Sequence, residues 1–529
     1  MLLSFIICTG LVALISWLKT RRTRLKTVND YFLSNRSLGF VLVGSSIFLT
    51  NLSGNLLIGE NESVYINNMS VMAWGMTSIL AMLVVSEFLL PVYLRIGAIT
   101  TPDFLEHRFD AVTKRIVSIV FLASYAINLI PTILYGGALA MNGIFHVSQR
   151  TGWDSTTTCC VLIVIIGITG SLYSILGGLR AMSISDTLLG FGMMTGCLLI
   201  SYYGFKYLGH GNLLNGAKVI LHQKKEHLNA IGSATDAVPF STIFTGMLLM
   251  NLYYWGMEQF IVQQALASKN LKECQKGIAL ACVGKLLSPL ILNLPGLIAV
   301  HMYPHLDNTR EVFPKLISDI LPVVFQGFMA SIVLGAVFST FNAGLNSSGT
   351  LFIMNIYKPW FDKKGKQKSD EQLVRGSKIF QVLLTLLGCC IAPFIILFKG
   401  GFYTYIQMLS GFFSVPIFSV LLVGFLTRKV PPIAAKIGLA FFILTYASVI
   451  LIFHPPMHYL HVLAILFVVT VGIMLLIGRL FPLKVPYQPE KHAVVDVKPW
   501  RYRHWASALL ITLMVLAFVL FSSIGIAGG

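Results

Sequence analysis

The sequence predicts an all-α polytopic membrane protein of about 14 transmembrane helices, on two observations. Only 11% of the 529 residues are charged, 56% are hydrophobic and the mean hydropathy is +0.77, whereas soluble domains carry roughly 25% charged residues. Apolar runs near 20 residues also recur along the whole length, as expected of helices that cross a ~30 Å hydrocarbon layer. Soluble enzymes, secreted disulfide scaffolds and disordered chains are excluded. A transmembrane β-barrel is disfavoured because its strands alternate polar and apolar residues over about 10 positions.

Fourteen apolar runs are the expected membrane spans. They lie near residues 2–18, 39–66, 70–94, 116–143, 157–177, 184–205, 240–265, 277–302, 323–356, 379–398, 403–427, 433–453, 459–478 and 506–526. The alternating connections hold 30 Lys and Arg on one side of the membrane and eight on the other, and Lys285 alone falls within a span. Because Lys and Arg collect in cytoplasmic loops, we expect a cell-membrane protein with both termini outside. The same rule explains the net charge of +18 without nucleic-acid binding.

The rest of the composition argues against a processing signal and against an enzyme. The first apolar run precedes its positive cluster, which is the reverse of the order in a cleavable signal peptide. The eight cysteines have no metal-binding spacing and are expected to be packing residues. The connections are too short for a soluble catalytic domain, and the sequence has no P-loop, GxSxG or HExxH motif. We therefore expect no enzyme activity and no cofactor, and a function that resides in the helix bundle.

Two spans are expected to break near the middle of the membrane. The second span has a polar, glycine-containing stretch from Thr50 to Asn55, and the seventh has one from Met250 to Gln259. Such residues weaken helices, and bare backbone at this depth is tolerated only where it lines a cavity or an ion. The two spans stand five apart, so they take equivalent places in an inverted five-helix repeat, which points to a central transport site. The alternative is that both are ordinary spans whose polar groups pair with neighbouring helices.

A third stretch, residues 335–349, is rich in small and hydroxyl-bearing residues. Ser339 and Thr340 offer neutral oxygens, and an unwound backbone at the first break could supply carbonyl oxygens, which together suit Na⁺. The alternative is close helix packing through small residues, which we expect for Gly335 and Gly344.

Two ionisable residues near membrane depth are also candidates for function. Lys285 costs ~2.5 to 3.5 kcal/mol to place within a span, so it needs a polar partner or a water-filled pocket. Asp186 lies at the inner end of its span, either as a helix N-cap in contact with water or as part of an ion relay. Pro131, Pro295 and Pro416 lie within spans, where each is expected to remove a backbone hydrogen bond and bend its helix.

Several short motifs, in their order and spacing, resemble the solute:sodium symporter family, particularly its bacterial sodium/galactose branch. They are Asp-Tyr-Phe-Leu at 30–33, Pro-Asp-Phe-Leu-Glu-His-Arg-Phe at 102–109, Gly-Gly-Leu-Arg-Ala at 177–181, Asn-Leu-Tyr-Tyr-Trp-Gly at 251–256, the segment 267–277 and Leu-Asn-Ser at 345–347. The resemblance covers nearly the full length. It implies a leucine-transporter-type core of two inverted five-helix repeats, each with a broken first helix, and solute uptake coupled to Na⁺ by alternating access.

The resemblance also implies which residues form the sites. Sodium would bind the backbone carbonyls of Leu49, Leu52 and Ala336 and the hydroxyls of Ser339 and Thr340, with Asp186 as the inner carboxylate. The solute would contact Asn251, Lys285 and Gln407, with Tyr254 as an inner aromatic gate and Trp255 beside it. A tyrosine at the gate would stack on the apolar face of a sugar.

The sequence departs from the family's sugar-binding pattern at two positions. Leu56 stands where sugar-transporting relatives carry a glutamine, and Gly75 stands where they carry a pocket glutamate. Losing that carboxylate leaves the pocket around Lys285 more positive, which favours a sugar acid or another small organic anion. The candidates to compensate for the lost carboxylate are Glu60, Glu62 and Glu258, and those to replace the polar contacts are Ser78, Asn55 and Asn61.

We therefore expect a membrane symporter that imports a small polar solute, a sugar or sugar derivative, together with Na⁺. The open alternatives are a small organic anion as the solute, and a non-transporting sensor or channel of the same fold. The expected organisation is an N-terminal extra helix and cytoplasmic loop (1–38), a first five-helix repeat (39–205), an extracellular loop (206–239), a second repeat (240–427) and C-terminal extra helices (428–529).

Overall fold

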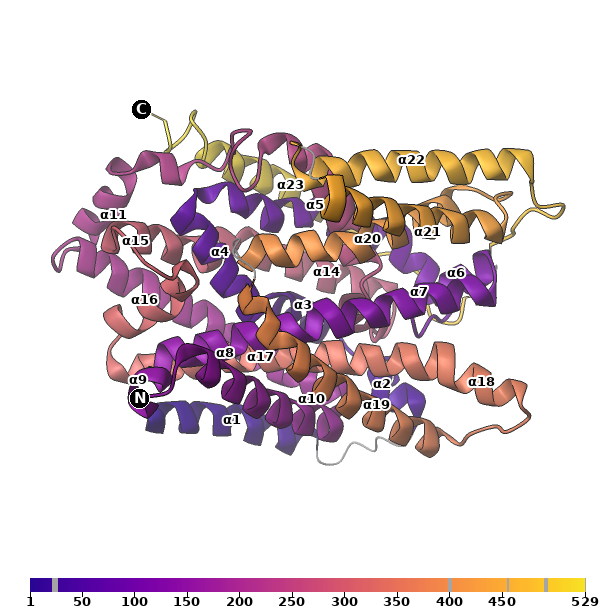
Figure 1. Ribbon diagram of the computed structural model, residues 1–529, viewed down its shortest axis with the longest axis horizontal. Helices are drawn as coiled ribbons and strands as arrows, with labels where there is room; N and C mark the ends of the chain where they lie inside the picture. Colours follow the sequence, from indigo (N-terminus) through magenta and orange to yellow (C-terminus); the bar gives the residue numbers. More distant parts are fainter. Residues whose placement is uncertain (21–26, 398–401, 454–455, 490–492, 529) are drawn as a thin grey trace.

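Helices account for almost all of the fold (Figure 1). The computed structural model describes residues 1–20, 27–397, 402–453, 456–489 and 493–528. The α-helices are α1 (Leu2–Thr20), α2 (Val28–Leu33), α3 (Phe40–Asn51), α4 (Gly54–Ile66), α5 (Met72–Arg95), α6 (Asp103–Arg108), α7 (Ala111–Ser124), α8 (Ile130–Phe145), α9 (Val147–Thr151), α10 (Ser155–Leu208), α11 (Leu213–His222), α12 (Gly246–Gly256), α13 (Gln259–Leu266), α14 (Leu271–Leu286), α15 (Leu294–Met302), α16 (Val312–Ile320), α17 (Val323–Phe352), α18 (Lys358–Lys363), α19 (Asp370–Ile391), α20 (Phe402–Leu426), α21 (Pro432–Ser448), α22 (Tyr459–Leu480) and α23 (Arg503–Leu520). The short 3-10 and π segments are η1 (Ser34–Arg36), η2 (Met69–Val71), η3 (Tyr125–Leu129), η4 (Lys225–Leu228), η5 (Phe240–Phe244), η6 (Pro289–Asn293), η7 (Thr309–Glu311), η8 (Ile353–Tyr357), η9 (Ala392–Leu397) and η10 (Val449–Phe453).

The helices agree with the predicted membrane spans. Over the described residues, twelve helical stretches are long and apolar enough to cross a membrane, and the bent pair of α3 and α4 makes thirteen. The remaining predicted span, 240–265, corresponds to α12 and α13, neither of which has the length to cross alone. Two crossings, Ser155–Leu172 and Ala181–Leu208, both lie within α10, so the connection predicted at 178–183 is helical.

The first predicted break is confirmed at Leu52 and Ser53, where α3 and α4 meet at a bend of 54°. The Ser53 side chain caps α4 by accepting a hydrogen bond from the Leu56 amide at 3.2 Å, which is a preferred role of serine. In an unbroken helix the amides of Ser53 and Leu56 would bond to the carbonyls of Leu49 and Leu52. Here they bond to the carbonyls of Asn51 and Ser53. The carbonyls of Leu49 and Leu52 are therefore released from the helical ladder.

The second predicted break is confirmed at Met257 and Glu258, between α12 and α13. The amides of both residues bond back to the Tyr253 carbonyl, at 2.7 and 3.1 Å, and so close α12. The Glu258 carbonyl accepts the amides of Ile261 and Val262 and so starts α13. The interpretation of the two spans as ordinary continuous helices is wrong.

The two broken helices have equivalent neighbours. Helix α3 packs against α14 and α10, and helix α12 packs against α5 and α20. In the predicted repeats, the second helix is α5 in the first repeat and α14 in the second repeat. The last helix is the second crossing of α10 in the first repeat and α20 in the second repeat. Each broken helix therefore packs against the second helix of the other repeat and the last helix of its own repeat, as expected of an inverted repeat.

Prolines widen three helices at the depth of the core. Each of the π turns η3, η6 and η8 ends two residues before a proline, namely Pro131, Pro295 and Pro359. Proline has no N–H for the carbonyl four residues earlier and its ring presses on that carbonyl, so the preceding turn opens. The predicted distortions at Pro131 and Pro295 therefore take the form of π turns, whereas Pro416 lies inside α20, which is assigned as one continuous α-helix.

Both termini lie at one end of the bundle (Figure 1). The Ala230 amide bonds to the Phe521 carbonyl at 2.6 Å, which ties the end of α23 to the predicted extracellular loop 206–239. The predicted cytoplasmic segments α2, α6 and α18 lie at the opposite end (Figure 1). Six of the counted Lys and Arg lie outside the described residues: Arg21, Arg22, Arg24, Lys26, Lys399 and Lys491.

At this opposite end, an ion pair joins the start of α7 to α21. Lys436 Nζ lies 2.6 Å from Asp110 Oδ2, and Asp110 Oδ1 accepts the Thr113 amide at 2.6 Å as the N-cap of α7. Burial raises the pKa of the Asp110 carboxyl, but the hydrogen bonds from Lys436 and Thr113 outweigh it and leave the pKa below its ordinary 3.8. The ionised form is therefore favoured in the folded protein.

We expect Asp110→Asn to lower stability slightly at pH 7. Asparagine keeps the cap but loses the charge, and because both side chains are partly exposed the loss should stay within about 1 kcal/mol. Since folding depresses this pKa, the stabilisation is present above about pH 4 and is lost as the pH falls through the folded-state pKa. Thermal unfolding of the purified wild type and variant should show a difference at neutral pH that disappears in acid. A difference that persists in acid would mean that the contact acts through packing.

Candidate functional site

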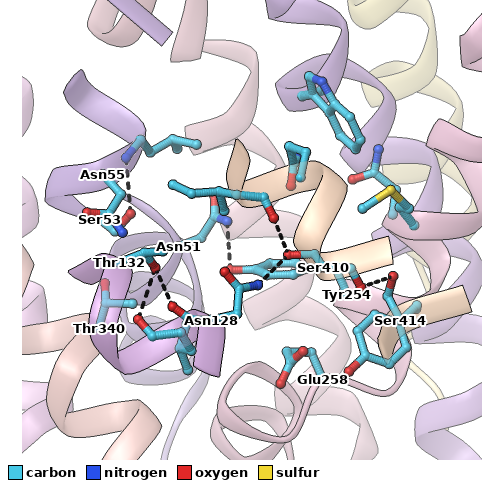
Figure 2. Close-up of a pocket in the computed structure, with 18 of the residues that line it drawn as sticks. Asn51, Ser53, Asn55, Asn128, Thr132, Tyr254, Glu258, Thr340, Ser410 and Ser414 are labelled. Carbon is cyan, nitrogen blue, oxygen red and sulfur yellow. Dashed lines mark hydrogen bonds between the residues drawn. The ribbon is translucent and has the colours of Figure 1, made fainter. Parts of the chain in front are cut away.

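A cavity of about 170 Å³ lies between the two broken helices (Figure 2). It is bordered by α3, α4, α5, α12, α14, α17, α20 and the π turn η3. All of the residues predicted to contact the solute or form the gate line it: Ser78, Asn251, Tyr254, Trp255, Lys285 and Gln407. The fold therefore brings together, from the four helices α5, α12, α14 and α20, a set of residues that is spread over more than half of the sequence.

Lys285 is the only Lys or Arg among the described residues that line this cavity, and it is 3% exposed. Its ammonium donates a hydrogen bond to Asn51 Oδ1 and lies 5.6 Å from the centroid of the Trp255 ring. The Asn51 amide in turn donates to the Tyr254 hydroxyl at 3.0 Å (Figure 2). A polar chain thus links Lys285 in the second repeat, through the first break, to the predicted gate.

The other predicted contacts are held by hydrogen bonds that leave capacity for a ligand. Asn251 Nδ2 donates to Thr77 Oγ1 at 3.0 Å, and Gln407 Nε2 donates to the Tyr403 hydroxyl at 3.3 Å. The Ser78 hydroxyl donates to the carbonyl three residues earlier, at 2.6 Å. Each side chain has further donor or acceptor sites, so the wall can hydrogen-bond a polar molecule without losing its own order.

Some polar atoms on the cavity wall have no partner in the described part of the chain. Asn55 Oδ1, Asn128 Oδ1 and Trp255 Nε1 are buried and unpaired, and their side chains border the cavity. An unpaired buried polar group is costly, so native proteins pair nearly all of them with protein, water or ligand.

The residues predicted to bind sodium meet where α3, α10 and α17 touch. The Asp186 carboxylate accepts hydrogen bonds from Ser339 at 2.6 Å, from Ser46 at 2.8 Å and from Thr50 at 3.5 Å. Asp186 is 1% exposed inside α10, so its interpretation as a water-exposed helix N-cap is wrong. The three hydroxyls donate to the buried carboxylate the hydrogen bonds that water would donate to an exposed one.

Oxygens of the backbone lie beside this carboxylate. Thr340 Oγ1 donates to the carbonyls of Thr50 at 3.0 Å and Ala336 at 3.2 Å, and Thr50 lies between Leu49 and Leu52, whose carbonyls the break releases. The neighbours Ser339 and Thr340 border different cavities. Thr340 lines the central one, while Ser339 and Asp186 line a second cavity of about 200 Å³ between α1, α10 and α17.

The glycines expected to serve helix packing do so. A Cβ on Gly344 would lie 2.9 Å from Leu129 Cδ2, and a Cβ on Gly335 would overlap the Leu189 side chain. The packing interpretation of these two positions is confirmed, and it coexists with the polar role of the hydroxyls between them.

Sequence reasoning missed some cavity residues. Asn51 stood out only as part of the first break; it is the last residue of α3, two residues before the Ser53 cap of α4. Tyr125, Asn128 and Ser410 carried no signal. Asn128 Nδ2 donates to Ser410 Oγ at 2.8 Å (Figure 2), and only the widened turn η3 and the packing of α20 bring them to the wall.

The chain is similar to known transporters along its length. The family model for the sodium:solute symporter family matches residues 31–440. The chain is 37% identical to the uncharacterized symporter YidK of Escherichia coli over 97% of this chain and 90% of that protein, and 28% identical to the sodium/glucose cotransporter of Vibrio parahaemolyticus over 78% of each.

A solved structure confirms the fold. A Na⁺-coupled sialic acid symporter, in a substrate-bound outward-open state, superposes with a TM-score of 0.77 at 18% identity, covering 92% of this chain and 98% of that one. The core of inverted five-helix repeats with a broken first helix is thereby established, and the protein is a sodium-coupled transporter rather than an enzyme. With three quarters of its length matched by the family model, the chain belongs to the sodium:solute symporter family.

Proposed function

We propose that this symporter imports a small polyhydroxylated solute, a sugar or sugar derivative, which binds in the central cavity. The observation that carries the proposal is the wall of that cavity, to which Lys285, Asn251 and Gln407 contribute donors and acceptors and Tyr254 and Trp255 contribute aromatic rings. A sugar presents hydroxyls at its edge and apolar C–H groups on its faces, which matches a polar ring above an aromatic surface. The similarity to the Vibrio sodium/glucose cotransporter supports the same class.

We propose that Na⁺ binds between the released carbonyls of Leu49 and Leu52, the Ala336 carbonyl and the hydroxyls of Ser339 and Thr340, near Asp186. The two hydroxyls donate their hydrogens to Asp186 and to the carbonyls of Thr50 and Ala336. A hydroxyl that donates its hydrogen elsewhere turns its lone pairs toward the remaining space. These oxygens are therefore oriented as ligands of a hard cation.

Coupling follows from the position of this site on the first break. Sodium would hold the break against α17, and the same break carries Asn51, which bonds Lys285 and Tyr254 in the solute cavity. Ordering this segment with sodium raises the affinity for solute, and by linkage solute raises the affinity for sodium equally. The membrane potential contributes about 2.3 kcal/mol per charge per 100 mV. The termini and the loop 206–239 would face outside, as the Lys and Arg count indicates.

The test is uptake into proteoliposomes of labelled hexoses, hexitols, uronic acids and amino acids, with and without an inward sodium gradient. We expect one of the neutral sugars to accumulate only with sodium. Uptake driven by protons and indifferent to sodium would overturn the ion assignment. Solute binding without any uptake would indicate a sensor, and sodium current that does not saturate would indicate a channel.

A small organic anion such as a sugar acid is the second candidate, because Lys285 is the only Lys or Arg among the described residues that line the cavity. Its test is the same panel. Uptake of a uronic acid that exceeds uptake of the matching neutral sugar, and that Lys285→Ala abolishes, would favour it.

Removing the gate ring should uncouple the transporter. Because the Tyr254 ring lines the cavity at the second break, we expect Tyr254→Ala to let solute exchange without sodium. Tyr254→Phe keeps the ring and loses only the hydrogen bond from Asn51. Losing one hydrogen bond of about 1 kcal/mol should change KM less than about tenfold. The measurement is solute efflux from preloaded proteoliposomes in sodium-free buffer. If both variants stay as tight as the wild type, Tyr254 is not the gate.

A further inference from the structure

Three carboxylates are the candidates to offset the positive charge of Lys285, and the structure distinguishes them by their partners and by whether they line the cavity. Glu62 does not line the cavity and accepts the Thr309 hydroxyl at 2.8 Å and the Phe402 amide at 3.1 Å. Glu258 lies at the second break and accepts the Tyr125 hydroxyl at 2.5 Å. Both Glu60 and Lys285 line the central cavity.

Glu60 is built into the wall. It lies one and a half turns into α4 and is 2% exposed, and Asn293 Nδ2 in the π turn η6 donates to its Oε2 at 3.0 Å. A buried carboxylate without a cation would be expensive, so its place opposite Lys285 is a matched arrangement. Among the described ion pairs within 4.0 Å none joins Glu60 to Lys285, so the two side chains border the same cavity without direct contact.

The position at which sugar-transporting relatives are expected to carry a pocket glutamate is a glycine here, packed closely against a neighbouring side chain. A Cβ on Gly75 would lie 2.7 Å from Ser288 Oγ on the facing helix. A side chain on Gly75 would therefore have to displace the Ser288 hydroxyl, and α4 contributes a carboxylate to the cavity wall through Glu60.

We propose that Glu60 is a specificity-determining residue that replaces the pocket glutamate expected at position 75. Glu60 then accepts hydrogen bonds from the hydroxyls of an electroneutral solute, and Lys285 donates hydrogen bonds to them. This inference rests on the proposed function and selects the neutral sugar over the sugar acid. A hydroxyl both accepts from an ammonium and donates to a carboxylate, so neighbouring hydroxyls can bridge the gap. A carboxylate on the solute would instead meet Glu60 with like charge in a desolvated cavity, which is discrimination by repulsion.

The experiment compares matched neutral and acidic sugars on the full-length protein with sodium present. The probes are D-glucose against D-glucuronate and D-galactose against D-galacturonate, in competition for uptake into proteoliposomes and in titrations of intrinsic tryptophan fluorescence, since Trp74 and Trp255 line the cavity. The variant is Glu60→Gln, which keeps an acceptor for Asn293. The matched control is Glu62→Gln, a buried carboxylate of the same helix that does not border the cavity.

A third variant moves the carboxylate. Gly75→Glu with Ser288→Ala is added to Glu60→Gln, because without its hydroxyl Ser288 leaves a Cβ contact of 3.6 Å, which is ordinary packing. We expect the wild type and Glu62→Gln to bind the neutral sugar better than its acid. Glu60→Gln should weaken neutral-sugar binding by about 10- to 100-fold, which is the factor for one charge-assisted hydrogen bond. The ratio of neutral-sugar affinity to uronic-acid affinity should fall by at least the same factor. The relocated carboxylate should restore the preference.

Two results would overturn the inference while leaving the proposed function intact. One is a wild type that binds the uronic acid better than the neutral sugar. The other is an unchanged preference in Glu60→Gln. If the wild type binds neither member of either pair, nor any sugar in the panel, the proposed function fails and the inference with it. The three patterns are distinct in the fluorescence titration, which does not depend on transport.

Discussion

Sodium-driven uptake should fall to the level of protein-free vesicles when Ser339→Ala and Thr340→Val are combined. The double variant removes both hydroxyl ligands that we propose for sodium and leaves only backbone carbonyls and Asp186. Each lost ligand to a cation is worth about 1.5 to 3 kcal/mol, so the sodium concentration for half-maximal uptake should rise by at least about 100-fold. Uptake measured over a sodium series checks this directly.

A second readout separates loss of sodium binding from loss of fold. A ligand that binds only the folded protein raises its unfolding temperature, so sodium should stabilise the wild type and leave the double variant unchanged. The matched control is Ser348→Ala on the same helix, whose buried hydroxyl donates to the Leu345 carbonyl at 2.8 Å and has no other hydrogen bond to the described residues. Sodium dependence that survives the double variant would place the ion elsewhere.

Gly44→Leu should prevent the core from assembling. Helix α3 approaches α14 so closely that a Cβ on Gly44 would lie 2.6 Å from the Gly277 carbonyl oxygen and 2.9 Å from Leu280 Cβ. A backbone carbonyl cannot rotate away, so the helix carrying the first break would have to shift. Overpacking typically costs about 1 to 3 kcal/mol, and a shift of α3 should also disturb the oxygens proposed for sodium.

The measurement is the yield of monodisperse protein in detergent and its unfolding temperature. Gly472→Leu is the control, because a Cβ there would meet nothing within 4 Å and the residue lies in another apolar helix, α22. We expect this control to purify like the wild type and Gly44→Leu to aggregate or unfold at a lower temperature. Equal behaviour of the two variants would mean that α3 and α14 can move apart freely.

The spans and both breaks were predictable because they depend on local composition. Hydropathy sets the length of a membrane helix, and the glycine and short polar residues around Ser53 and Glu258 weaken the backbone ladder wherever the chain folds. The family resemblance then identified Lys285, Asn251 and Gln407, and the structure brings all three to one cavity.

What only the tertiary structure decided is which groups face one another. The family resemblance grouped Asp186 with Ser339, but nothing in the sequence indicated that Ser46 and Thr50 would also donate to Asp186. Nor did it indicate that the adjacent Ser339 and Thr340 would border two different cavities. The choice of Glu60 among three carboxylates likewise depended on packing. These contacts join residues more than 100 positions apart, and their geometry is set by how the helices pack. The sequence by itself determined where the membrane-crossing helices lie and which two of them are broken.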